Sequence, residues 1–413
     1  MYIDEDLSAL AKARRMLHMT VVSHSSPSHS DIVAATIHFL QSTTLFSLVK
    51  AWLVENPQFE TLFQTHLGSW LIDQEHCFKT TLAKLNEDRQ QSLSTMISEH
   101  IRQTSLARAH AFLSVGNLDS AYLVLQDLRD NLGSLSTTVE ILVLLCVVCC
   151  HLSKFSEALV HIERCRVLIK DHDSKDSYSF ADSISKLDLL QGFSYFNLTR
   201  FEESLPLLLK SVAEKSILPD LVSATEIAKF VVVGGLLNCS SDWLTINIVE
   251  NSALRYILGE DELFSNAVIN YCALSFPTFL ESVRDLSESF TFNLFLFPLK
   301  TKFSDLTFRN AIRLLLSCFN SLSFNQLSEL LGFEQCEFLL NYCQNLCQQG
   351  FVPFKLSSID DVIYFERSDV AVENTAIKEA LGSVDFCASQ LESKLWTQMY
   401  RLQKEKDHVT TIL

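Results

Sequence analysis

One short pattern recurs three times between residues 105 and 215, and it restricts the fold of this chain more than any other feature. Each copy has an apolar helical stretch, a short polar turn, a large apolar residue and, three positions later, a small residue. The apolar residues are Leu118, Phe155 and Phe201, and the small residues are Ala121, Ala158 and Ser204. A small side chain there lets two antiparallel helices approach closely, so each copy predicts a helical hairpin.

The spacing of the three copies predicts how these hairpins assemble. The large apolar residues are 37 and then 46 positions apart (155 minus 118, and 201 minus 155), and a polar insertion at 170–178 fills the longer interval. Hairpins of this type bury each face against a neighbour and leave a curved surface. The sequence therefore predicts a mostly α-helical chain that begins with a right-handed, tetratricopeptide-like solenoid.

Composition and charge narrow the class of protein. Of the 413 residues, 48% are hydrophobic and only 17 are Gly or Pro (10 plus 7), which excludes a disordered chain and disfavours an all-β fold. The net charge of −16 disfavours a nucleic-acid partner or an anionic membrane surface. The longest apolar runs, 141–150 and 230–237, are much shorter than the roughly 20 residues of a membrane span.

The last third of the chain predicts a winged helix. A helix ending near residue 319 leads into a short turn at 321–323, and Gly332 ends a second helix. The remaining elements are a third helix at 334–349 and strands at 351–356 and 362–365. The third helix contains no Lys or Arg, whereas a helix that reads DNA needs cations against the phosphates. We therefore expect this winged helix to contact proteins.

Two surfaces are candidates for these protein contacts. The first is the winged-helix sheet edge, with Phe354, Val362, Ile363, Tyr364 and Phe365. The second is a tail helix over about 375–406, whose apolar residues recur in steps of three and four, interrupted by Gln398. Its seam consists of Ile377, Leu381, Val384, Ala388, Leu391, Leu395 and Leu402. We expect the seam to join a multi-chain helical bundle; the alternative is that it packs back on its own domain.

We expect no catalytic, cofactor or metal site. The sequence has no phosphate-binding glycine loop, no Gly-x-Ser-x-Gly turn and no His-x-His motif. His66, His76 and Cys77 lack the spacing of a ligand set. Most of the twelve cysteines lie inside apolar helical stretches, which is typical of reduced cysteine in the cytosol or nucleus. Cys146, Cys149, Cys150, Cys336, Cys343 and Cys347 are expected in the core.

A helical solenoid that runs into a winged helix and then a C-terminal helix resembles the PCI-domain family. Residues 228–237 look like the Tyr-Gly-Gly-Leu helix of the subunit-one family of the COP-nine signalosome. Residues 309–313, 346–351 and 364–369 are similar to three further segments of that family. Residues 320–323 depart from it, since they replace its usual Ser-Pro-Tyr-Val. The equivalent subunit of the 26S proteasome lid has the same layout and remains the alternative.

This resemblance implies a function and an organisation. It implies a non-catalytic scaffold that supports removal of a ubiquitin-like modifier from cullin ubiquitin ligases, in the nucleus and cytoplasm. Its partners would be other PCI-domain and isopeptidase subunits, and cullin ligases through the complex, with no nucleic acid or membrane. A nucleic-acid-associated PCI protein is a weaker alternative. The expected parts are a flexible segment (1–30), the repeats (31–220), a PCI domain (221–370, its winged helix from 306) and the bundle helix (371–413).

Overall fold

The computed structural model divides the chain into two compact units, Met1–Ile312 and Arg313–Leu413. The residues that the structure describes are 6–25, 27, 29–95, 98–130, 134–172, 180–214, 217–259, 261–319, 321–332, 336–348, 354–357 and 362–365.

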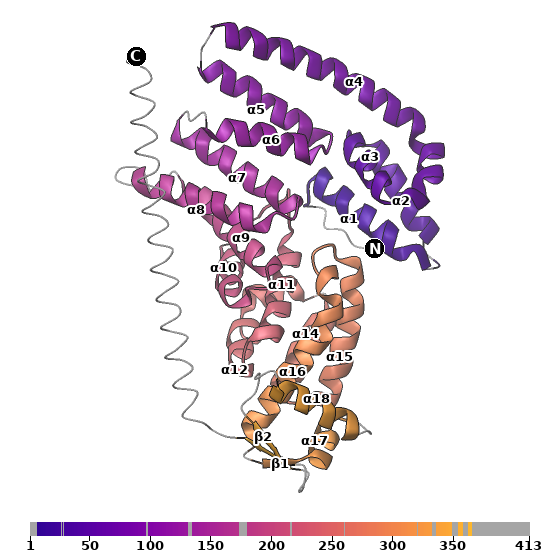
Figure 1. Cartoon of the computed structure of the whole chain (residues 1–413), viewed down its shortest axis with the longest axis vertical. Helices are drawn as coiled ribbons and strands as arrows, with labels where there is room; N and C mark the ends of the chain where they lie inside the picture. Colours follow the sequence, from indigo (N-terminus) through magenta and orange to yellow (C-terminus); the bar gives the residue numbers. More distant parts are fainter. Residues whose placement is uncertain are drawn as a thin grey trace. The chain divides into compact units, whose positions relative to one another are not determined.

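The first unit is built of helices (Figure 1). Its N-terminal half contains α1 (Ala9–Val22), α2 (His29–Gln41), α3 (Phe46–Glu55), α4 (Glu60–Thr95), α5 (Ser98–Ser114), α6 (Leu118–Asp130) and α7 (Leu135–His151). It continues with α8 (Phe155–His172), α9 (Ala181–Asn197), α10 (Phe201–Ala213), α11 (Ala224–Asn238), α12 (Ser241–Leu244), α13 (Ser252–Leu258), α14 (Glu262–Cys272) and α15 (Phe276–Ser289). Helix α16 (Lys300–Cys318) crosses the boundary between the units.

Short helical turns join several of these helices. They are the 3-10 turns η1 (Ser23–Ser25), η2 (Pro57–Phe59), η5 (Phe290–Phe292) and η6 (Phe297–Leu299), and the π-helix η4 (Thr245–Val249).

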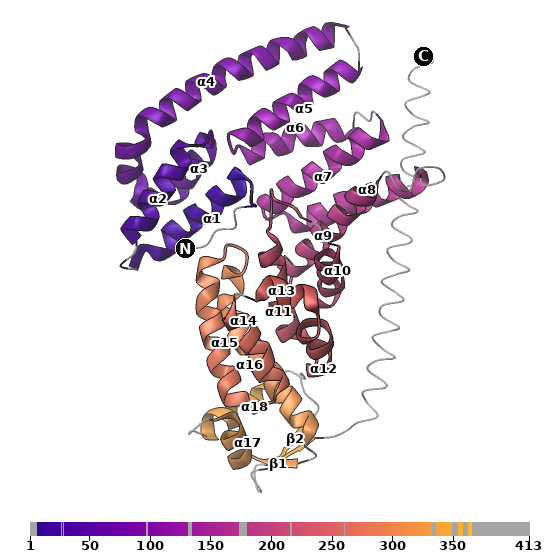
Figure 2. The same ribbon diagram turned by 180° about the vertical axis from the view of Figure 1, so that it is seen from behind.

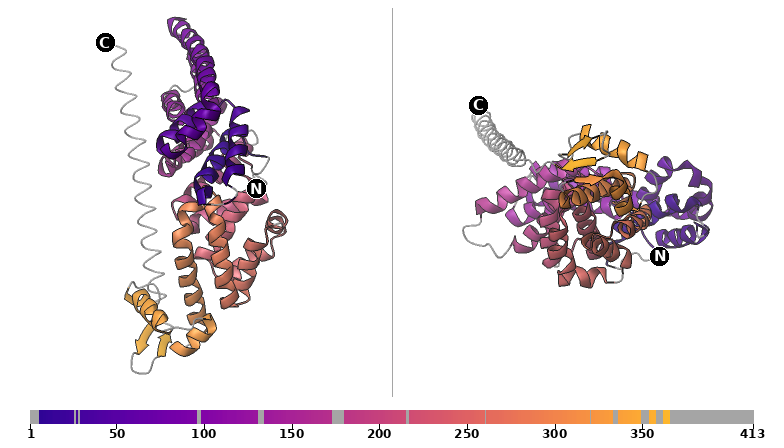
Figure 3. Two further views of the ribbon diagram at one scale, coloured as in Figure 1. Left: turned by 90° about the vertical axis from the view of Figure 1, so that its right-hand side faces the viewer. Right: turned by 90° about the horizontal axis from the view of Figure 1, so that it is seen from below.

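The three predicted hairpins are present, and they stack in chain order. Helices α5 and α6, α7 and α8, and α9 and α10 pack as pairs, and each pair also contacts the next (Figures 1 and 2). The small residues Ala121, Ala158 and Ser204 are fully buried, as expected where two helices approach closely. The Ser204 hydroxyl donates to the Gly192 carbonyl across the α9–α10 contact at 2.7 Å. The predicted solenoid is thereby confirmed (Figure 3).

A common backbone turn joins the helices of each hairpin. Gly116, Ser153 and Thr199 lie two positions before the large apolar residue, and all three have left-handed backbone conformations, with φ of 77°, 59° and 61°. In each turn the following amide donates to the carbonyl five residues back, which satisfies a helix-terminal acceptor. Leu274 makes the same turn between α14 and α15, with φ of 55°. A fourth hairpin therefore exists that the sequence pattern missed.

The N-terminal region differs from the prediction. The segment 1–30 was expected to be flexible, but α1 occupies Ala9–Val22 and buries seven of its residues, including Met16 and Leu17. The Ser8 side chain caps its first turn, and the Ser8 amide donates to the Pro219 carbonyl. Helix α1 is thus packed in the unit, because its apolar face and two arginines find partners there.

The second unit contains the predicted winged-helix elements. They are β1 (Ser321–Ser323), α17 (Phe324–Leu331), α18 (Cys336–Gln348), β2 (Phe354–Ser357) and β3 (Val362–Phe365). A capping box at Ser323 begins α17, and Gly332, with φ of 73°, ends it. The strands form an antiparallel sheet in the order β1-β3-β2. Residues 321–323 were predicted to be a turn and form a strand instead.

In the part of the chain that the structure describes, no helix combines the length and the apolar character needed to cross a bilayer.

Candidate functional site

The sheet of the second unit corrects one prediction about its free edge. β3 pairs with β1 through Ser321–Ser323 and with β2 through Phe354–Ser357, so it is the central strand. A central strand has no free backbone groups with which to pair a further strand. Val362, Ile363 and Tyr364 are paired on both sides and therefore cannot form the free edge. The reason is the short strand β1, which takes the second side of β3. Phe365 pairs with Phe354 alone, and Phe354 lies on an edge strand. That these residues bind a partner stays a prediction.

Burial separates the predicted contact residues further. Ile363 is only 1% exposed and belongs to the core of the winged helix, and Val362 is half-buried. The side chains of Phe354, Tyr364 and Phe365 lie outside the described residues. So does the whole tail seam of Ile377, Leu381, Val384, Ala388, Leu391, Leu395 and Leu402, which stays a prediction.

A second surface, which sequence reasoning missed, runs along the solenoid. The residue five positions after the large apolar residue of each hairpin is apolar and exposed: Leu123, Val160 and Pro206. Leu123 is 60% exposed and Val160 is 67% exposed, and both lie on the second helix of their hairpin. Single exposed apolar residues are common on proteins, but a row at one repeat position is a regular surface. The repeat spacing could have revealed it.

Helix α1 is fixed to the middle of the solenoid by a buried ion pair. The Arg15 guanidinium donates through Nε to Glu226 at 2.7 Å and through Nη2 to the other oxygen of the same carboxylate. It also donates to the Ala11 and Leu221 carbonyls, at 2.9 and 2.8 Å, and lies over the ring of Phe295. Both charged groups are buried and each is saturated with partners, which is the condition for tolerating buried charge.

A buried histidine next to this pair is held neutral. Nη1 of Arg14 donates to Nδ1 of His151 at 2.7 Å and to its carbonyl at 2.6 Å. Nε2 of His151 therefore carries the proton and donates to the Asp220 carbonyl at 2.7 Å. Burial, together with the positive charge of Arg14, lowers the pKa of His151 to about 3. His151, on α7, thus joins α1 to the loop before α11 through its two ring nitrogens.

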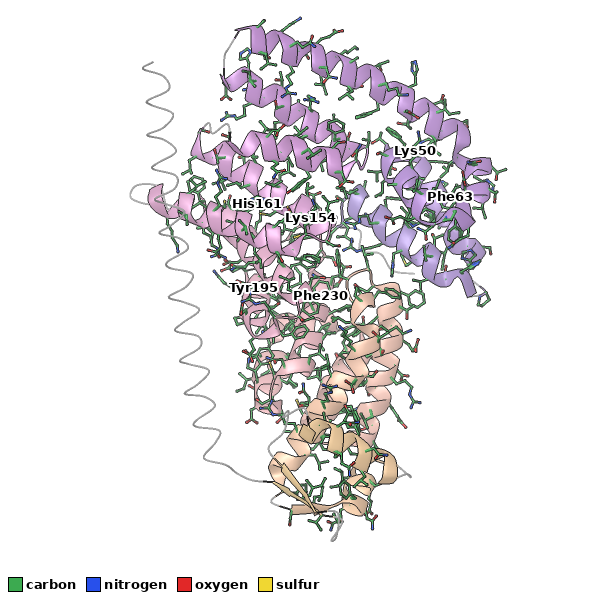
Figure 4. The ribbon with its side chains drawn as sticks, in the orientation of Figure 1. Lys50, Phe63, Lys154, His161, Tyr195 and Phe230 are labelled. Atoms are coloured by element: carbon green, nitrogen blue, oxygen red, sulfur yellow. The ribbon has the colours of Figure 1, made fainter. Side chains whose placement is uncertain are left out.

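A third polar cluster joins α8, α9 and α10. The buried Asp188 carboxylate accepts from Arg166 and, at 2.6 Å, from Lys210. Arg166 also donates to Gln191, whose amide donates to the Tyr195 hydroxyl at 3.2 Å. Tyr195 is labelled in Figure 4. The hydrogen bond to Asp188 raises the pKa of Lys210. All of these groups tie helices together, and we assign them a structural role.

Three cysteines of α7 are buried in the core of the solenoid. Cys146, Cys149 and Cys150 are buried in α7, as predicted, and burial raises the pKa of Cys149 and of Cys150 to about 12. Such thiols are protonated and poor nucleophiles. His66 and His76 are exposed on α4. Among the described residues, no three His, Cys, Asp or Glu side chains gather as metal ligands would.

The adjacent glycines Gly234 and Gly235 are packing positions within α11. A Cβ on Gly234 would lie 3.1 Å from Leu205 of α10, and one on Gly235 would lie 2.8 Å from Leu244. Both faces of α11 are therefore in close contact with neighbouring helices. The Asn310 amide donates to the Leu236 carbonyl at 3.1 Å, so two of the four segments that carry the family resemblance touch each other.

A cavity of about 550 Å³ opens near the N-terminus of α1. Its walls come from the start of α1, the α2–α3 connection, and the C-terminal parts of α5 and α7. The polar side chains in its wall include Thr43, Thr44, His110 and His151. His151 already has partners on both ring nitrogens, and this leaves it no group to offer a ligand.

Comparison with known proteins adds one finding. The family model described as 26S proteasome subunit RPN7 matches residues 69–243, which is 175 of the 413 residues (243 minus 69, plus 1). No curated protein matches the chain. The matched stretch begins within α4 and ends in α12, so it covers the three predicted hairpins but not the winged helix. Over its solenoid the chain is therefore similar to a proteasome-lid subunit family, and this supports a PCI-type protein.

Proposed function

We propose that this chain is a non-catalytic scaffold subunit of a multi-subunit PCI complex, of the type found in the 26S proteasome lid. The observation that carries the proposal is the similarity of residues 69–243 to the RPN7 family, in a chain whose second unit is a winged helix. The row of Leu123, Val160 and Pro206 supports it, because a regular exposed apolar surface is typical of protein contacts.

Two further surfaces would serve the assembly. The edge strands β1 and β2 each leave one side of the sheet open to a strand from a neighbouring subunit. The tail seam of seven apolar residues would enter a helical bundle shared with other subunits. We place the complex in the nucleus and cytoplasm.

A signalosome scaffold, which would support deneddylation of cullin ligases, is the second candidate. The observation in its favour is the Gly-Gly-Leu helix, whose two glycines and whose contact with Asn310 have defined packing roles. The family match favours the proteasome lid over this candidate.

Native purification of the tagged chain, followed by quantitative mass spectrometry, tests the proposal. Stoichiometric recovery with an isopeptidase subunit and proteasomal ATPases would support the lid. Recovery with cullins and without ATPases would support the signalosome. Recovery as a lone monomer would refute the scaffold function in both forms.

The predicted tail helix also offers a matched control for the seam. Leu391→Asp together with Leu395→Asp places two charges in the seam, whereas Gln398→Asp places one at the position that already interrupts it. We expect the first variant to lose its companion subunits and the second to keep them. Equal recovery from the two variants would exclude the seam as an assembly element.

A further inference from the structure

Two histidine side chains lie next to each other where α1 is connected to α2. His24 belongs to the turn η1, His29 is the first residue of α2, and the centroids of their rings are 5.2 Å apart. Both α1 and η1 pack against α2 (Figure 1). His24 is exposed and His29 is half-buried, so solvent reaches the pair through His24. These two residues are called the His24–His29 pair below.

A buried hydroxyl fixes one ring nitrogen of His29. The Ser23 side chain is only 1% exposed, and its oxygen lies 3.1 Å from Nδ1 of His29. The Ser23 hydroxyl donates to the Thr20 carbonyl at 3.5 Å, so its oxygen accepts from Nδ1–H, and the lone pair of the imidazole is on Nε2. One ring nitrogen that donates to the protein while the other keeps its lone pair is the usual arrangement of a histidine that binds a metal.

A buried aromatic ring lies against both histidines. The centroid of the Phe59 ring is 5.9 Å from that of His24 and 6.0 Å from that of His29. Phe59 is 3% exposed and is stacked on Trp52 at 5.3 Å, so its position is fixed by the core. Phenylalanine offers no hydrogen bond to an imidazole. Among the described residues, none forms a hydrogen bond with Nε2 of His29 or with either ring nitrogen of His24.

The separation of the two rings fits a tetrahedral metal ion. A zinc ion on an imidazole nitrogen lies about 3.2 Å from the ring centroid, since the Zn–N bond is about 2.0–2.1 Å and the ring radius is about 1.2 Å. Two centroids 5.2 Å apart then subtend about 109° at the ion, which is the tetrahedral angle. An edge-to-face contact between two rings has a similar separation, so a test has to distinguish the two.

We propose that the His24–His29 pair binds a divalent transition-metal ion such as Zn²⁺, through Nε2 of His29 and one ring nitrogen of His24. Neutral imidazole is a ligand that zinc, copper and nickel share, whereas magnesium and calcium prefer oxygen. Water would complete the coordination, since no third His, Cys, Asp or Glu of the described chain joins the pair. The ion would cross-link η1 to the start of α2 and thereby hold the connection between α1 and α2.

The direct test measures Zn²⁺ binding to the purified full chain, by equilibrium dialysis against zinc chloride under reducing conditions followed by elemental analysis. We expect the parent to bind one Zn²⁺ more than His24→Phe, whose affinity at this site should fall at least about tenfold. Phenylalanine keeps a ring against His29 and Phe59 but removes both nitrogens. The variant therefore distinguishes a metal ligand from a residue that only packs, and His29→Phe should behave in the same way.

A matched control and a positioning variant make the result specific. His66→Phe makes the same replacement at an exposed histidine on α4 and should bind as many Zn²⁺ ions as the parent. Ser23→Ala removes the hydrogen bond to Nδ1 but no ligand, and it should weaken binding about tenfold. Full Zn²⁺ affinity in Ser23→Ala would exclude the positioning role of Ser23.

Thermal unfolding gives a second readout that does not count ions. Zinc that binds only the folded chain should raise the unfolding temperature of the parent and of His66→Phe, and should have less effect on His24→Phe and His29→Phe. Equal zinc binding and an equal zinc-dependent shift in the parent and in both pair variants would overturn the proposal. The His24–His29 pair would then be an aromatic contact between η1 and α2 only.

Discussion

Two regions of the solenoid each bury an arginine, but they differ in how many hydrogen-bond partners they provide for it. Around α1, Arg15 has a carboxylate, two carbonyls and an aromatic ring as partners, all from this chain. On the α4–α5 hairpin, Arg102 is buried to the same degree but has an unpaired nitrogen. The first arrangement joins segments 211 positions apart and fixes the fold. The second leaves one buried donor unpaired, which costs free energy, so the two arginines should affect the stability of the fold with opposite signs.

The largest effect on stability should come from replacing Glu226, the carboxylate that pairs with the buried Arg15. Glu226→Gln keeps the shape and the capping role of Glu226 but leaves the Arg15 charge buried without its counter-ion. We expect a loss of about 3–5 kcal/mol in the free energy of unfolding, measured by urea denaturation of the full chain. Glu203→Gln is the matched control, because Glu203 pairs with Arg200 at the surface, where both side chains are about half exposed, and its loss should cost at most about 1 kcal/mol. Similar losses in the two variants would remove the distinction.

The stability of the α5–α6 hairpin should depend on the backbone conformation of its turn more than on charge. Gly116 joins α5 to α6 with φ of 77°, and a Cβ there would lie 2.7 Å from the Leu48 Cβ. Gly116→Ala should therefore cost about 2–4 kcal/mol, from backbone strain together with overpacking. Thr199→Gly at the equivalent turn should be neutral or stabilise by up to about 1 kcal/mol, because it relieves a left-handed β-branched residue. Thermal unfolding of both variants checks the opposite signs.

Low pH should lower the free energy of unfolding through His151, which lies between α1 and α7. The pKa of His151 is about 3 in the folded chain, below its ordinary value of 6.5, so the unfolded chain binds the proton more readily. Stability is therefore complete above pH 6.5 and falls as the pH decreases towards the folded pKa. We expect this residue to account for a loss of about 2–3 kcal/mol between pH 7 and about 4.5. Urea titrations at both pH values should show a shallower loss in His151→Gln; an equal loss would contradict this role.

The smallest effect on stability should come from Arg102, whose Nη1 is buried without an acceptor in the described structure. Arg102→Met replaces a buried guanidinium that lacks one partner by an apolar chain of similar length. The free energy of unfolding should stay the same or rise by about 1 kcal/mol, in contrast to the loss expected for Glu226→Gln. A fall of more than about 2 kcal/mol in urea denaturation would show that Arg102 is structural, as Arg15 is.

The sequence predicted local features well and distant pairings poorly. The hairpins around Phe155 and Phe201 follow from residues close together in the chain, and so does the Gly332 helix end. β1 was missed because its three residues become a strand only through pairing with Val362–Tyr364. α1 was missed because Arg15 makes the segment look solvent-exposed, while its partner Glu226 is remote in sequence.

The candidate surfaces show the same limit. The prediction that β3 is an edge strand is wrong because β3 also pairs with β1, and no local sequence pattern reveals this pairing. The row of Leu123, Val160 and Pro206 could have been found by extending the repeat alignment by two further positions. The buried, unpaired Nη1 of Arg102 could not be predicted, since the burial of one guanidinium nitrogen becomes visible only once the helices are packed.

The fourth hairpin shows what a side-chain pattern leaves out. Leu274 keeps the left-handed turn and its hydrogen bonds, yet the position of the small residue holds Phe279, and the family match ends before it, at residue 243. A left-handed residue with this hydrogen bond can end a helix whatever side chains follow it. Main-chain conformation therefore identifies a helical hairpin at a place where the spacing of large and small residues does not.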